Sequence, residues 1–68
     1  MRFRRFSPID REYPVFELVD GEDILLDISK NDLGTVEVAF HAALSGRVME
    51  WSTIERALIE GRGLADSE

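Results

Sequence analysis

The chain has 68 residues, with 8 Lys+Arg against 14 Asp+Glu, one His and no Cys, and a formal charge of −6. This length is typical of one small domain, spanning 1–68, whose core is thin. The absence of cysteine excludes a disulfide framework and a thiolate metal site. No apolar run approaches the roughly 20 residues of a membrane helix, and no secretory signal follows the N-terminus. We therefore expect a cytoplasmic protein with no membrane contact.

The charge is divided unevenly along the chain. Residues 1–12 have four arginines and two acids, a net of +2, whereas 13–68 have four basic residues and twelve acids, a net of −8. An acidic body repels nucleic-acid phosphates and favours basic protein partners. The first twelve residues are the one part of opposite character.

Residues 1–12 are predicted to form a basic arm or an edge strand. Arginines on an edge strand protect it from pairing with other chains, and an arm could instead pair with the acidic body of a second copy. The alternative is contact with nucleic acid, because aromatic and basic residues that interleave suit base stacking and phosphate binding. The candidate nucleic-acid residues are Arg2, Phe3, Arg4, Arg5 and Phe6.

Residues 15–41 contain three runs in which apolar residues alternate with others, which predicts a three-stranded antiparallel meander. The alternation favours a loop at 19–21 that pairs Leu18 with Glu22, and a second loop that pairs Asn31 with Thr35. With these loops a single face collects the apolar set Phe16, Leu18, Ile24, Leu26, Ile28, Val36, Val38 and Phe40.

Residues 52–66 are predicted to form a helix. Ser52 and Glu55 match a capping box, and Gly61 lies on the apolar stripe, where a missing side chain permits close approach to the sheet. Gly63 lies off the stripe, so the helix can fray or end there. The stripe consists of Ile54, Ala57, Leu58, Gly61, Leu64 and Ala65. We predict a two-layer α+β fold, with an antiparallel β-meander of three to four strands packed on one face by this C-terminal helix.

The other face of the sheet is mixed in character. It is either a solvated face with scattered apolar residues or a contact surface for a partner or a second copy. Trp51 packs over the helix start or the sheet edge, or else anchors an interface. The candidate protein-interaction residues are Val15, Glu17, Leu25, Asp27, Glu37, Ala39, His41 and Trp51.

No catalytic, cofactor or metal site is predicted, and no cofactor is expected. His41 is a single histidine without clustered ligands, and a surface position at a strand end accounts for it. We predict a small acidic, non-catalytic interaction module that binds a protein partner or a second copy of itself as a homodimer. Its size, acidity and pattern of three strands and a helix occur in many short proteins, and some inhibitor- and immunity-type proteins are among them. The alternative is a nucleic-acid-associated regulator that uses the basic arm.

Overall fold

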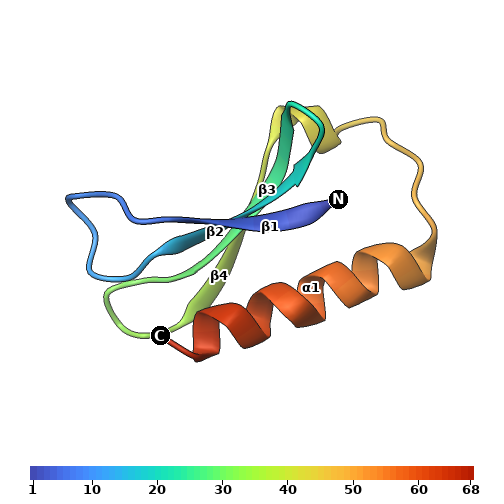
Figure 1. Cartoon of the computed structure of the whole chain (residues 1–68). Helices are drawn as coiled ribbons and strands as arrows, with labels where there is room; N and C mark the ends of the chain where they lie inside the picture. Colours follow the sequence, from blue (N-terminus) through green and yellow to red (C-terminus); the bar gives the residue numbers. More distant parts are fainter.

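The computed structural model describes residues 1–68 as a four-stranded sheet followed by a single long helix (Figure 1). The strand order is β1-β2-β3-β4, and each neighbouring pair is antiparallel. The helix α1 packs mainly on β3 and β2. The predicted α+β class is confirmed. The elements are β1 (Arg2–Phe6), β2 (Val15–Asp20), β3 (Asp23–Lys30), β4 (Val36–Phe40), the 3-10 helix η1 (Ala42–Leu44) and α1 (Trp51–Asp66).

The β2–β3 hairpin closes with a shorter loop than the sequence predicts, because the strands continue until Asp20 pairs with Asp23. Leu18 lies opposite Leu26, so the predicted pairing with Glu22 is wrong. The shift is an even number of residues, and side chains alternate with a period of two. Most of the predicted apolar face therefore survives the change of register.

A bulge interrupts this hairpin between Leu18 and Val19. Leu18 lies opposite Leu26, whereas Val19 lies opposite Ile24, so Leu25 is the extra residue of β3. The bulge moves Ile24 to the face opposite Leu18, which corrects its predicted position. Residues 24–26 are all apolar, so apolar and polar residues do not alternate in this segment. The sequence pattern therefore gives no sign of the bulge.

The β3–β4 hairpin has the predicted register. Asn31 donates its backbone N–H to the Thr35 carbonyl at 2.9 Å, and its side-chain Oδ1 accepts from the N–H groups of Leu33 and Thr35. Gly34 takes the left-handed conformation at φ 80 that the turn requires. The predicted pairing of Asn31 with Thr35 is confirmed.

The core lies between the sheet and α1. Small residues one turn apart, Ala57, Gly61 and Ala65, form the buried face of the helix. A Cβ added at Gly61 would overlap the Ile28 side chain and lie 2.8 Å from Phe3 Cζ. The close approach predicted at Gly61 is confirmed. The buried cluster consists of Phe16, Leu18, Leu25, Leu26, Ile28, Ala57 and Ala65.

The helix begins one residue earlier than predicted. Glu50 occupies the N-cap position and makes no side-chain cap hydrogen bond. Ser52 lies inside the first turn, and its Oγ contacts Glu50 Oε2 at 3.4 Å, so the predicted capping box is wrong. The helix continues through Gly63 to Asp66 without fraying. No helix of the structure combines the length and the apolar character that crossing a membrane requires.

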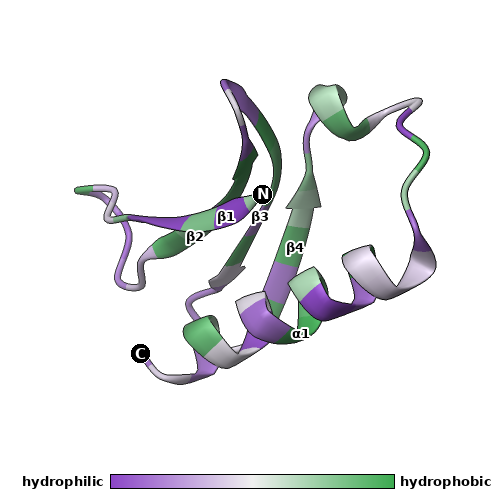
Figure 2. Ribbon diagram, turned by 45° about the vertical axis from the view of Figure 1, so that its right-hand side comes forward, coloured by the Kyte–Doolittle hydropathy of each residue, from purple (hydrophilic) through white to green (hydrophobic).

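A single helix is too narrow for this sheet. Strands lie about 4.8 Å apart, and a helix with its side chains is about 10 Å wide, so four strands cannot all be covered. At β4, Val38 is 40% exposed and Phe40 64% exposed. The ribbon of β4 includes hydrophobic (green) stretches in Figure 2, and α1 contacts this strand less than it contacts β2 or β3.

Candidate functional site

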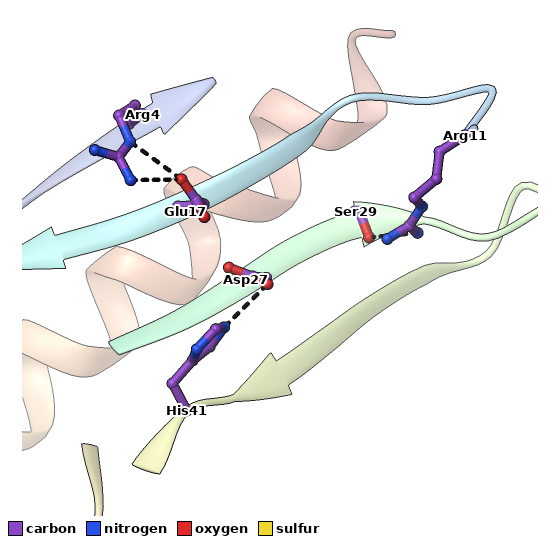
Figure 3. A network of polar contacts seen from close by, with 6 residues as sticks. All are labelled: Arg4, Arg11, Glu17, Asp27, Ser29 and His41. Atoms are coloured by element: carbon purple, nitrogen blue, oxygen red, sulfur yellow. Dashed lines mark hydrogen bonds and ion pairs between the residues drawn. The ribbon is translucent and has the colours of Figure 1, made fainter. Parts of the chain in front are cut away.

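The reverse face of the sheet, which faces away from α1, holds a row of polar residues. Glu17 of β2 lies opposite Asp27 of β3, and two like charges in that position repel. Each acid has a nitrogen partner on its outer side: Arg4 Nη2 lies 2.8 Å from Glu17 Oε1, and His41 Nε2 lies 3.0 Å from Asp27 Oδ2 (Figure 3). Most of the acidic groups predicted for interaction on this face are therefore held in internal pairs.

Three of the candidate interaction residues, Val15, Leu25 and Ala39, do not form an exposed apolar patch on the reverse face. Val15 is only 4% exposed and Leu25 is fully buried, whereas Ala39 is exposed. A side chain from the β1–β2 connection reaches β3, where Arg11 Nη2 donates to Ser29 Oγ at 3.2 Å (Figure 3). Leu25 is buried because the bulge places it in the core cluster. Neither buried residue can contact a partner in this structure.

The basic strand β1 is the outer neighbour of β2, and its residues are largely engaged within the chain. Arg4 pairs with Glu17, and Arg5 Nη2 lies 3.1 Å from Glu68 Oε1. Phe3 packs against the core. Arg2 and Phe6 are exposed, and Arg2 has no ion pair. Of the candidate nucleic-acid residues, two arginines are in ion pairs, Phe3 packs against the core, and only Arg2 and Phe6 are left exposed and unpaired.

The outer edge of β4 has no neighbouring strand. His41 donates its N–H to the Leu25 carbonyl, and Asn31 donates to Thr35, both at 2.9 Å. Hydrogen-bonded pairs alternate along an antiparallel ladder, so the odd-numbered residues of β4 direct their backbone groups to β3. The even-numbered residues direct theirs to solvent, and these are Val36, Val38 and Phe40.

The same three residues carry side chains on the helix side of the sheet. A groove of about 460 Å³ runs between β4 and α1, and its lining includes Val36, Val38 and Leu58. Trp51 lies two helical turns before Leu58, so it projects on the same side of α1. Its side chain is 77% exposed. We name the set Val36, Val38, Phe40, Leu58 and Trp51 the β4 edge surface.

Three charged residues, Glu37, Arg62 and Asp66, also line the groove beside the β4 edge surface. Arg62 and Asp66 form an i,i+4 pair at 3.6 Å on the rim of the groove, and Glu37 points to the reverse face. The β1 edge, in contrast, carries three arginines, the residue type that protects an edge. Of the two edges of the sheet, β4 is therefore the one suited to pairing with another strand.

Most of this surface could not be found from alternation alone. Of the predicted interaction residues, Trp51 shares one side of α1 with Leu58, and Glu37 and Ala39 lie on β4 but face the other way. Val38 and Phe40 were expected in the core. Their exposure could have been predicted by comparing the width of one helix with the width of a four-stranded sheet. Comparison of the chain with protein-family models, curated proteins and solved structures finds no match.

Proposed function

We propose that the chain is a small acidic, non-catalytic protein-interaction module of the cytoplasm that binds its partner through the β4 edge surface. One observation carries the proposal: Val36, Val38 and Phe40 have backbone groups that face solvent, and Val38 and Phe40 also expose their apolar side chains. An added strand would take the backbone groups as hydrogen-bond partners, and its side chains would fill the groove, which is β-strand addition.

The charge of the chain favours protein over nucleic acid as the partner. The formal charge is −6, so phosphates are repelled and basic proteins are attracted at long range. With Glu17 and Asp27 held in internal pairs, this attraction falls to acids that have no ion pair, such as Glu37 and Glu55. An inhibitor- or immunity-type role belongs to this proposal, because such proteins act by covering a partner rather than by catalysis.

Photo-crosslinking in the native cell tests the surface. A benzophenone amino acid replaces Phe40 in one variant and Ile9 in a control, because Ile9 is an exposed apolar residue in the β1–β2 connection. We expect a discrete covalent adduct from position 40 that Val38→Pro abolishes, and none from position 9. The cross-linked partner, once purified, should bind at least tenfold more weakly to Val38→Pro. Equal labelling from both positions, or none from position 40, would contradict the proposal.

A further inference from the structure

We infer that the partner at the β4 edge surface is a second copy of this chain, whose β4 pairs antiparallel with the first about a two-fold axis at Val38. This inference rests on the proposed function and specifies its partner, which strand pairing selects against the long-range preference of a −6 chain for basic proteins. It follows from the hydrogen-bonding phase of β4, from the charges on its two faces, and from the contrast with β1.

The backbone phase selects one register. When β4 is turned on itself about Val38, that residue lies opposite its own copy, and Val36 lies opposite Phe40 of the second copy. All three are the residues whose N–H and C=O groups face outward, so every such group finds a partner. A slip of one residue would bring in groups already bonded to β3, and a slip of two would leave one outward residue without a partner strand.

The charges allow this register on β4 but not its counterpart on β1. On the reverse face, Glu37 lies opposite Ala39 of the second copy, so no like charges face each other directly. If β1 were turned on itself in the same way, Arg4 would lie opposite Arg4, which is destabilising. A mixed pairing of β1 with β4 is heterologous and generates open chains rather than a closed dimer. The self-complementary edge is therefore β4.

The pairing also joins the two exposed apolar surfaces. Both copies of α1 would lie on the same side of one continuous eight-stranded sheet. Because α1 packs mainly on β3 and β2, the helices would lie roughly four strand spacings apart, about 19 Å, and would not touch. The floor between them would consist of β4 residues from both copies, with Leu58 and Trp51 of each copy along its sides. The interface is thus made by strands rather than by helices.

Sedimentation of the full chain gives the first test. We expect a mass of twice 7.7 kDa at high concentration and a dissociation constant at least tenfold weaker for Val38→Pro. The Val38 N–H faces solvent, so proline there removes no bond to β3, and circular dichroism checks that the variant folds. Val38→Lys serves as a second edge-blocking variant. Ile59→Lys is the matched control, because it also replaces an exposed apolar residue and should leave the association unchanged.

Cross-linking gives the register. The chain has no cysteine, so single cysteines can be introduced without background. Opposite Cα atoms would lie roughly 5.5 Å apart, so a short bis-thiosulfonate reagent should join Val38→Cys to itself. It should join Val36→Cys to Phe40→Cys in a mixture, but neither to itself, because like positions would be about 14 Å apart along the strands.

The outcomes separate the inference from the proposed function. Salt should strengthen self-association, because two chains of charge −6 repel, whereas salt would weaken binding to a basic partner. A strict monomer at millimolar concentration overturns the second copy as partner, and an adduct between position 40 and another protein would leave the proposed function standing. A dimer that Val38→Pro and Val38→Lys leave intact, or one that cross-links in another register, also overturns the inference.

Discussion

The ring of Phe3 occupies the space that a side chain at Gly61 would need. A Cβ built on Gly61 would lie 2.8 Å from Phe3 Cζ and would overlap the Ile28 side chain. The contact holds β1, at the edge of the sheet, against α1. It also withdraws Phe3 from the role in base stacking that the basic strand suggests.

Gly61→Ala should destabilise the fold by about 1–3 kcal/mol, because overpacking at this contact exceeds the gain in helix propensity. Gly63→Ala is the matched control, since nothing lies within 4 Å of a Cβ at that position. It should stabilise the fold by about 0.5–1 kcal/mol. Urea unfolding of both variants gives the comparison. If alanine were equally stabilising at both positions, the close packing of Phe3 on the helix would be disproved.

The stability of the start of α1 depends on the residue at the N-cap position, which is Glu50 and not Ser52. Glu50 is the N-cap and makes no side-chain cap bond, so Glu50→Asp should raise the free energy of unfolding by about 0.5–1 kcal/mol. Ser52→Ala should have almost no effect, because Ser52 is not the cap. Chemical denaturation of the two variants distinguishes this geometry from a capping box, in which the loss of Ser52 would be the costly change.

Arg47 fastens the segment after η1 to the β2–β3 hairpin. Its guanidinium lies 2.7 Å from Asp20 Oδ2 and 2.9 Å from Asp23 Oδ2, and its Nε donates to the Ala43 carbonyl. Exposed pairs contribute about 0.2–1 kcal/mol each, so Arg47→Ala should cost about 1 kcal/mol in total and less at high salt. Amide exchange should accelerate in η1 and the following segment. Arg56→Ala, which removes an arginine with no ion pair, should leave those exchange rates unchanged.

Trp51 should matter for association and not for folding. Its side chain is 77% exposed, so Trp51→Ala should change the free energy of unfolding by no more than about 0.5 kcal/mol. Leu26→Ala, at a fully buried position, should cost about 2–5 kcal/mol. Thermal and urea unfolding measure both variants at a concentration where the wild-type chain is monomeric. A large loss with Trp51→Ala would place that side chain in the core instead.

The architecture was predictable because it depends on local patterns. Alternating apolar residues indicate the strands, and the stripe with Gly61 at its centre indicates the helix and the face that it buries. The bulge was not predictable, because Leu25 and its two neighbours are all apolar. At the start of the helix, no local signal shows that Glu50 rather than Ser52 is the cap.

The candidate site was harder to predict because it depends on contacts between distant parts of the chain. Arg4 forms an ion pair with Glu17, so this acid of the reverse face is already occupied within the chain. Val15 is buried, and Arg11 forms a hydrogen bond with Ser29 nearby. Exposure of Phe40 follows from the relative widths of sheet and helix. The alternation of apolar residues along one strand cannot predict these pairings or exposures.

Along β4, residues that the fold needs alternate with residues that the proposed binding needs, so mutations at the two kinds of position should have different effects. At Glu37 and Ala39 the backbone holds the fold while the side chains are exposed, so a mutational scan should tolerate most residues there except proline. At Val38 the backbone is free of β3 and the side chain faces the groove. Proline there should give a folded chain that has lost its partner. Alleles that abolish function without lowering protein abundance should therefore recur at every second position of this strand.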